Sequence, residues 1–151
     1  MNVRNAKISD AEAICSLVSF YAEKDEMLFR SMADIYENIQ AFLIAEIDGT
    51  IVGCCALQII WSDLAEIKSL AVEETNSGRG VGKTLVEAAC ERANELGLPS
   101  VFALTLVPDF FEKLKFRVVD KDTLPMKVWT DCAKCPKQDR CDEIAVIKSV
   151  K

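Results

Sequence analysis

A loop with three glycines in five positions, Gly78, Gly80 and Gly82, separates an apolar strand from a helix. Glycine lets the backbone take positive φ angles and approach a ligand closely, because it has no Cβ. The start of a helix has unpaired N–H groups and partial positive charge. The loop therefore predicts an anion site suited to a phosphate or pyrophosphate. The residues expected to form it, two of them cationic, are Ser77, Gly78, Arg79, Gly80, Val81, Gly82, Lys83 and Thr84.

Three phosphate-binding motifs compete for this loop. A Walker A loop requires Gly-x-x-x-x-Gly-Lys-[Ser/Thr], but Ser77 replaces its first glycine, and the later apolar strand at 101–106 runs into Val107-Pro108 rather than ending in an aspartate for magnesium. A Rossmann Gly-x-Gly-x-x-Gly begins at Gly78 and Gly80 and then meets Lys83, with no acidic residue on a following strand. A third pattern, [Gln/Arg]-x-x-Gly-x-[Gly/Ala], matches at Gly80 and Gly82 and departs only at Ser77. A tight turn without a ligand is the alternative to all three.

Hydrophobic periodicity and turn residues predict alternating strands and helices. Asp48-Gly49 is typical of a two-residue hairpin turn, and Ser31 is suited to cap a helix. Gly97 and Pro99 end the helix after the glycine loop, whose apolar face comprises Leu85, Val86, Ala89, Ala93 and Leu96. The expected strands are 3–7, 41–47, 50–60, 64–72, 101–106, 116–119 and 143–150, and the expected helices are 9–21, 31–39, 82–96 and 109–114.

This order of elements and the third loop pattern resemble the GNAT N-acetyltransferase superfamily. Residues 64–72 resemble its fourth strand, and Phe-Phe-Glu-Lys-Leu-Lys-Phe at 110–116 resembles its Phe-Tyr-x-Lys-x-Gly-Phe segment. The resemblance covers about residues 3–120. It implies an α/β (α+β) fold with a mixed, mostly antiparallel central sheet of about six or seven strands flanked by helices. It also implies an acetyl-CoA cleft between splayed fourth and fifth strands.

The chain is similar, over nearly its whole length, to the amino-acid N-acetyltransferase branch of the N-acetylglutamate synthase type. The supporting segments are Leu-Phe-Arg-Ser at 28–31, Ile-Gln-Ala-Phe at 39–42, the segment 48–57, and Leu-Pro-Met-Lys-Val-Trp at 124–129. The branch implies acetyl transfer to the α-amino group of glutamate or a similar acidic amino acid, which would start an arginine-type biosynthetic route. The alternatives are a GNAT acting on another small amine or a peptide terminus, and a non-catalytic acyl-CoA sensor.

The fourth strand is expected to carry the chemistry. The backbone of Leu70, Ala71 and Val72 is suited to pair with the pantetheine arm of acetyl-CoA and to donate an N–H to the thioester oxygen. Strand alternation predicts Glu66, Lys68, Leu70 and Val72 on one face. The resemblance makes Glu66 the general base, the alternative being a surface carboxylate paired with Lys68. The tyrosine usual in the later segment is Phe111, which has no proton to give.

An amino-acid substrate needs its carboxylates held. Arg30 is suited to bind one with two hydrogen bonds, and Ser31 to assist unless the helix cap uses it. Lys68 and Lys127 are further candidates, with a solvated surface charge as the alternative for each lysine. Lys115 replaces the usual glycine after the short helix and costs about 1 kcal/mol if that position requires a positive φ.

Seven cysteines fall into two groups. Those within apolar runs read as small buried hydrophobes, namely Cys15, Cys54, Cys55 and Cys90. Cys132, Cys135 and Cys141 form a cluster in an expected hairpin at about 130–142, and the first pair has zinc-knuckle spacing. The cluster lacks a fourth cysteine or histidine, so a zinc site, a reversible disulfide and free thiols are all open.

The composition argues against several kinds of catalysis and several classes of binding partner. The chain has no histidine, which excludes Ser-His-Asp, Cys-His and histidine-based zinc catalysis. A net charge of −6 argues against nucleic acid. No segment is apolar over a membrane-spanning length and the first residues do not resemble a signal peptide, so a cytoplasmic protein without membrane contact is expected. Residues 1–151 are expected to form a single domain, with homodimerisation left open.

Overall fold

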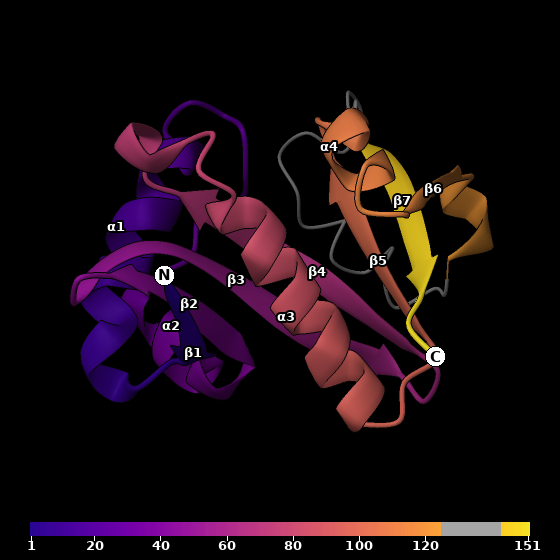
Figure 1. Ribbon diagram of the computed structural model, residues 1–151, viewed down its shortest axis with the longest axis horizontal. Coiled ribbons are helices and arrows are strands. Elements are labelled where there is room, and N and C mark those ends of the chain that lie inside the picture. The colour runs from indigo at the N-terminus through magenta and orange to yellow at the C-terminus, as the bar shows by residue number, and fades with distance from the viewer. Residues whose placement is uncertain (125–142) are drawn as a thin grey trace.

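The computed structural model describes residues 1–124 and 143–151, within which one seven-stranded sheet has helices on both faces (Figure 1). The strand order is β1-β2-β3-β4-β5-β7-β6. β4 and β5 are parallel, and the other neighbouring pairs are antiparallel. The strands are β1 (Asn2–Asn5), β2 (Phe42–Ile47), β3 (Thr50–Trp61), β4 (Leu64–Val72), β5 (Ser100–Thr105), β6 (Arg117–Val119) and β7 (Ile144–Ser149). The helices are α1 (Ala11–Ala22), α2 (Met32–Glu37), α3 (Val81–Glu95) and α4 (Pro108–Glu112).

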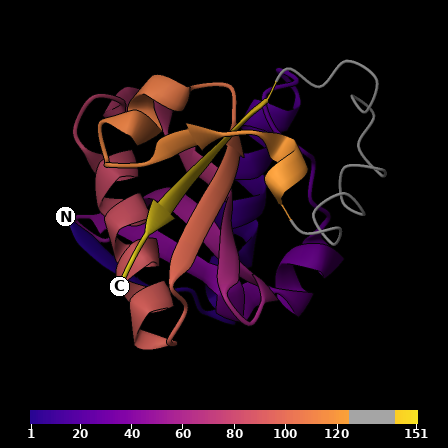
Figure 2. The ribbon, with the colours of Figure 1, turned by 90° about the vertical axis from the view of Figure 1, so that its right-hand side faces the viewer.

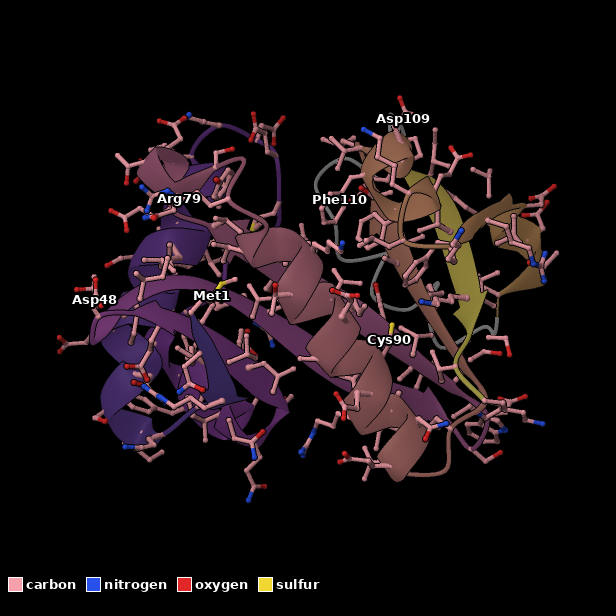
Figure 3. All side chains as sticks on the ribbon, viewed as in Figure 1. Met1, Asp48, Arg79, Cys90, Asp109 and Phe110 are labelled. Atoms are coloured by element: carbon pink, nitrogen blue, oxygen red, sulfur yellow. The ribbon has the colours of Figure 1, made fainter. Side chains whose placement is uncertain are left out.

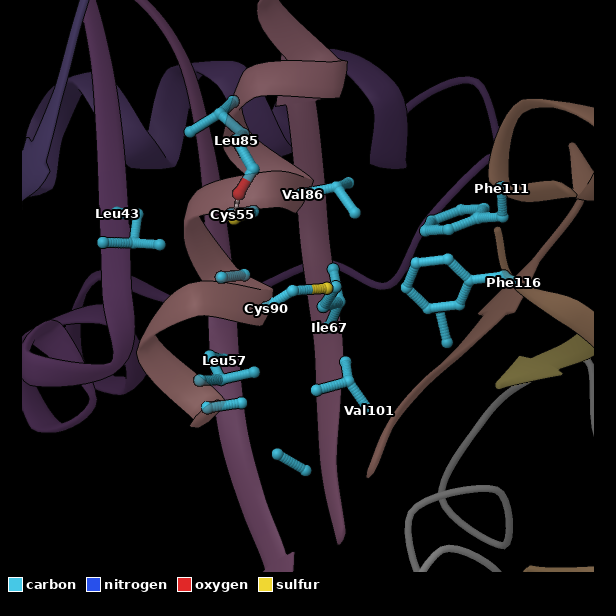
Figure 4. Packing of buried hydrophobic residues seen from close by; sticks show 14 of the residues in the cluster. Leu43, Cys55, Leu57, Ile67, Leu85, Val86, Cys90, Val101, Phe111 and Phe116 are labelled. Carbon is cyan, nitrogen blue, oxygen red and sulfur yellow. Dashed lines mark hydrogen bonds between the residues drawn. The ribbon is translucent and has the colours of Figure 1, made fainter. Parts of the chain in front are cut away.

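The two faces of the sheet have separate cores. α3 covers one face, and α1 and α2 cover the other (Figure 2). Under α3, Leu85 and Val86 pack against Cys55 and Ile67 of the sheet (Figure 4). Under α1 and α2, Ile14 and other apolar side chains pack against Cys54, Ala56 and Ala71. β3 therefore alternates between the two cores, as a strand buried on both faces must.

Local sequence signals account for several chain reversals. Asp48 and Gly49 have φ angles of 50° and 78°, as a hairpin turn with two left-handed residues requires. Gly97 has φ 86° directly after the cap of α3, and the Leu98 N–H donates to the Ala93 carbonyl at 2.9 Å. The prediction that Leu96 belongs to the buried face of this helix is wrong, because the chain leaves the helix there and the side chain is exposed.

The predicted fold class and every predicted strand are confirmed, with shifts of one or two residues at the ends. The second helix is shorter than predicted. α2 ends at Glu37, and a separate 3-10 turn covers Ile39–Ala41 before β2. In the described part of the chain no helix is long and apolar enough to cross a membrane.

Candidate active site

β4 and β5 diverge and open the sheet. Their register contains three pairs, Leu64 with Ser100, Ala65 with Val101, and Glu66 with Phe102. Beyond Glu66 the register ends, although β4 continues to Val72 (Figure 1). The predicted splay of the fourth and fifth strands is therefore present. From residue 67 onward, no strand among residues 1–124 and 143–151 pairs with the side of the β4 backbone that faces β5.

The glycine loop lies at the open end of this splay. Gly78 and Gly80 have φ angles of 82° and 80°, a conformation that favours glycine, and Gly80 is the cap residue of α3. α3 begins at Val81, so its first N–H groups have no acceptor within the helix. Arg79 is exposed at the outer edge of the loop (Figure 3), where its Nη1 donates to Asn76 Oδ1 at 3.2 Å. Lys83 is also exposed.

Gly82 and Thr84 have structural roles that the loop pattern does not indicate. A Cβ on Gly82 would lie 3.3 Å from the Phe110 ring and 3.8 Å from Val72. Phe110 projects from α4 toward the start of α3 (Figure 3), so this glycine allows α4 to close against the loop. The Thr84 hydroxyl donates to the Gly80 carbonyl at 2.8 Å within the helix.

A β-bulge in β4 overturns the predicted alternation. Cys54 pairs with Ala71 and Ala56 pairs with Lys68, so Ser69 and Leu70 together stand opposite a single residue of β3. Glu66 and Lys68 therefore face the α1 and α2 side, whereas Leu70 and Val72 pack against the core under α3. The expectation that these four residues share one face is wrong, because Ser69 takes φ 53° and reverses the pattern.

Glu66 and Lys68 lie together on the sheet face that α1 and α2 cover. The Glu66 side chain is 6% exposed, and its Oε1 is 3.8 Å from the Nζ of Lys68, which is 23% exposed. Gln58 stands opposite Glu66 on β3. A buried carboxylate at the point where β4 and β5 separate, with a cation next to it, is a combination typical of catalytic sites. The predicted pairing with Lys68 is present, but the carboxylate is not on the surface.

Arg30 approaches β4 from the connector between α1 and α2. Its Nε donates to Asp34 Oδ2 at 2.7 Å, and its Nη1 donates to Ser69 Oγ at 3.2 Å. The guanidinium carbon is 5.1 Å from the centre of the Phe42 ring, and the side chain is 13% exposed. Ser31 caps α2, as predicted, by accepting from the Asp34 N–H at 3.1 Å. Arg30 is thus held beside the bulge before any ligand arrives.

The peptide between Ser69 and Leu70 has a defined direction. The Ser69 carbonyl accepts from Cys54 Sγ on β3 at 3.6 Å. The N–H and C=O groups of a trans peptide point in opposite directions, and the described residues contain no cis peptide. The Leu70 N–H therefore points away from the Cys54 thiol.

Tyr21 fixes the end of β4 from α1. Its hydroxyl donates to the Val72 carbonyl, and the Glu73 N–H donates to the Val52 carbonyl at 2.8 Å. Burial raises the pKa of the Tyr21 hydroxyl, so it remains protonated as a donor. Ser69, Asp34 and Tyr21 were not expected from the sequence. Of these three, only Asp34 could have been found from the sequence, because it stands four residues after Arg30, a spacing at which opposite charges come together on a helix.

Comparison with known proteins places the chain in a family. The sequence profile of the acetyltransferase (GNAT) family matches residues 8–116. The chain belongs to the GNAT acetyltransferase family. An uncharacterized N-acetyltransferase of Chlorobaculum tepidum is 43% identical to it over 98% of this chain and 96% of that protein. An amino-acid acetyltransferase of Mycobacterium tuberculosis is 36% identical over 85% of this chain and 75% of that protein.

Solved structures give the same assignment for this acetyltransferase. A Mycobacterium tuberculosis protein in complex with CoA and NLQ superposes with a TM-score of 0.85 and 30% identity, over 99% of both chains. N-acetylglutamate synthase of Neisseria gonorrhoeae, complexed with coenzyme A and N-acetyl-glutamate, superposes with a TM-score of 0.91 and 26% identity. That match covers 99% of this chain but 35% of the gonococcal enzyme, so the chain spans about a third of its length.

Two family positions differ in this acetyltransferase. Phe111 is 4% exposed and packs edge-on against Phe116, with ring centres 5.2 Å apart (Figure 4). It belongs to the core and supplies no proton. Lys115 has φ 76° after α4, the condition under which a non-glycine residue costs about 1 kcal/mol.

Of the four cysteines predicted to be buried hydrophobes, three are buried. Cys54 and Cys55 are fully buried, and burial raises the pKa of the Cys54 thiol to about 12, which makes it an inert neutral thiol. Cys90 is buried and Cys15 is half-buried. Lys127 and the cluster of Cys132, Cys135 and Cys141 lie outside the described residues. Among residues 1–124 and 143–151, no three potential ligands gather to hold a metal ion.

Proposed function

We propose that this GNAT protein transfers the acetyl group of acetyl-CoA to the α-amino group of an acidic amino acid, glutamate being the acceptor we expect. The observation that carries the proposal is the placement of Glu66 and Arg30 beside the same opened strand, with the glycine loop at its far end. The amino-acid acetyltransferases among its relatives support this acceptor class. Residues 1–151 would act as one catalytic unit.

Acetyl-CoA binding is argued from the loop and the strand. The pyrophosphate would lie at the start of α3, against the N–H groups from Val81 onward, with Arg79 and Lys83 adding positive charge. The pantetheine arm carries peptide-like amides, and these would pair with the β4 backbone at Leu70–Val72, where β5 has separated. The thioester would then lie near the bulge.

Catalysis would proceed by direct attack. Glu66 accepts a proton from the acceptor ammonium, directly or through water, and the neutral amine attacks the thioester carbonyl carbon. Negative charge develops on the carbonyl oxygen, which the Leu70 N–H stabilises. The C–S bond breaks and CoA leaves as a thiolate, while the nitrogen loses its second proton to water and keeps the acetyl group as an amide. With Phe111 in place of tyrosine, that thiolate is protonated by water or departs unaided.

Arg30 and Lys68 would bind the carboxylates of the acceptor. The hydrogen bonds of Arg30 to Asp34 and Ser69 use three of its five N–H donors. One donor on each terminal nitrogen therefore stays available for an incoming carboxylate, in the fork geometry that favours two hydrogen bonds. Ser31 and Lys127 would make further contacts with the acceptor carboxylates, although the helix cap already uses one lone pair of the Ser31 hydroxyl.

A turnover screen tests the acceptor. Release of free CoA is measured with each of the twenty amino acids, and then with glutamate amidated at one carboxyl or the other. We expect glutamate to give the highest kcat/KM and each amide to be poorer. A small amine or a peptide terminus as the best acceptor would overturn the acidic amino acid. A non-catalytic sensor would bind acetyl-CoA but release no CoA with any acceptor.

A further inference from the structure

Ser69 has an unusual backbone conformation for its place in the fold. Among the described residues, four non-glycine residues have positive φ, namely Asp25, Asp48, Ser69 and Lys115. The other three lie in turns that end a helix or join two strands, where such a conformation is common. Ser69 lies inside β4, in the part of the strand beyond the end of its pairing with β5. A non-glycine residue held there against its preference indicates that surrounding contacts determine the conformation.

Two hydrogen bonds hold the bulge residue, and two more support the arginine that makes one of them. Arg30 Nη1 donates to Ser69 Oγ at 3.2 Å, and Cys54 Sγ donates to the Ser69 carbonyl at 3.6 Å. Asp34 fixes Arg30 in turn, since Nε donates to Oδ2 at 2.7 Å. Asp34 is itself fixed by the Asn38 amide, which donates to Oδ1 at 2.8 Å. A chain of hydrogen bonds therefore runs from α2 through Arg30 to the hydroxyl of the bulge residue.

The regular strand pairing is interrupted at the bulge. Ser69 and Leu70 have no partner in the β3 register, and the β5 register ends at Glu66. Because the regular ladder is interrupted here, side-chain contacts contribute to fixing the rotation of the peptide between these two residues. The same peptide carries the Leu70 N–H, which points away from the Cys54 thiol. Its direction therefore depends on the Ser69 side chain and on the thiol of Cys54.

We propose that Ser69 is a positioning residue for acetyl transfer: its hydroxyl, held by the Arg30–Asp34 pair, aims the Leu70 N–H at the thioester oxygen. The inference rests on the proposed binding of acetyl-CoA along β4. It gives Asp34 and Arg30 a role in orienting the donor, apart from any contact with the acceptor. A misdirected N–H would stabilise the developing negative charge less while leaving the rest of the CoA contacts in place.

The test compares Ser69→Ala, Ser69→Gly and a control, Asp48→Gly. Both Ser69 variants lose the hydroxyl, and the glycine variant also loses the backbone strain. Asp48→Gly relieves the strain of a non-glycine residue at a similar positive φ, 50° against 53°, in the β2–β3 hairpin. We expect kcat to fall about 10- to 100-fold in both Ser69 variants, because removing an oxyanion donor outright costs 10²–10³. CoA, which has no thioester carbonyl, should bind all three variants within about twofold of the unmodified protein.

The outcomes separate positioning from structure. Loss of kcat with CoA affinity retained, in a Ser69→Gly variant that melts no lower than the unmodified protein, supports the inference. A kcat within threefold of normal in both Ser69 variants overturns it, as does a parallel loss of kcat and CoA affinity. The acceptor used is the one that the unmodified protein turns over best. Failure of glutamate as acceptor would therefore not be mistaken for failure of the Ser69 assignment.

Discussion

Replacing Gly80 by aspartate tests the anion site with a control that the chain itself provides. Gly80 has φ 80° and Gly49 has φ 78°, and a Cβ at either position has no heavy atom within 4 Å. Gly80→Asp and Gly49→Asp therefore cost the same backbone strain, about 1–2 kcal/mol, and add the same charge. The difference between them is location. One charge lies at the cap of α3 and the other in the β2–β3 turn.

The expected loss of affinity follows from Coulomb's law. A carboxylate about 4 Å from one phosphate charge is repelled by about 1 kcal/mol in bulk water and about 4 kcal/mol at an effective dielectric constant of 20. The open space around Gly80 indicates an exposed position, which favours the lower part of this range per charge. A pyrophosphate carries more than one charge, so we expect Gly80→Asp to weaken CoA binding by roughly tenfold to a thousandfold.

Titration calorimetry with CoA measures this directly at low and at high salt. Gly49→Asp should bind CoA like the unmodified protein, while the same backbone strain lowers its free energy of unfolding. High salt should restore part of the affinity of Gly80→Asp, because an exposed charge repulsion is screened. If the two variants bind CoA within threefold of each other, the loop is only a turn and the pyrophosphate lies elsewhere.

Three further predictions concern single side chains. Glu66→Gln should lower kcat about 10²-fold or more with acetyl-CoA affinity unchanged, and an unchanged rate from about pH 6 to 9 would make Glu66 structural. Arg30→Ala should raise the KM for the acceptor roughly tenfold to over a hundredfold, because losing a hydrogen-bonded charged pair costs about 1.5–3 kcal/mol. Equal weakening of the binding of both substrates would instead assign Arg30 to the scaffold. Hydrogen bonding from Arg4 lowers the pKa of the buried Asp10 carboxyl in the folded protein. Ionised Asp10 therefore stabilises the folded state fully above its pKa in the unfolded chain, near 4, and this stabilisation is lost as the pH falls through its pKa in the folded protein. Asp10→Asn should flatten that acid limb in urea titrations, and an unchanged limb would contradict the role of the Arg4 pair.

Much of the fold could be predicted from the sequence because its signals are local. Ser31 caps a helix, Asp48-Gly49 makes a hairpin turn, and Gly97 ends α3, each through bonds to residues only a few positions away. Element ends were less predictable. α2 stops at Glu37 because the chain must turn through a 3-10 segment to enter β2, and that turn is set by packing against the sheet.

The site was predictable only in part, because its residues act through long-range contacts. The glycine loop can be recognised from its residue types and their spacing, and its place at the start of α3 agrees with the prediction. Glu66 was found from its strand, but its burial could not be read from one strand alone. The Arg30 contact with Ser69 joins residues 39 positions apart, and Tyr21 reaches Val72 across 51 positions. No local pattern encodes such pairs.

The bulge shows why one inserted residue matters for the proposed reaction. With unbroken alternation, the side chains of Glu66 and Leu70 would share a face of β4. Because Ser69 takes φ 53°, the strand instead presents Glu66 toward α1 and α2 and passes Leu70 to the side of α3. A two-substrate transfer requires the base to face the acceptor while the donor binds along the other side of the same strand. The bulge is compatible with this arrangement, and its residue Ser69 accepts a hydrogen bond from Arg30, the residue proposed to hold the acceptor.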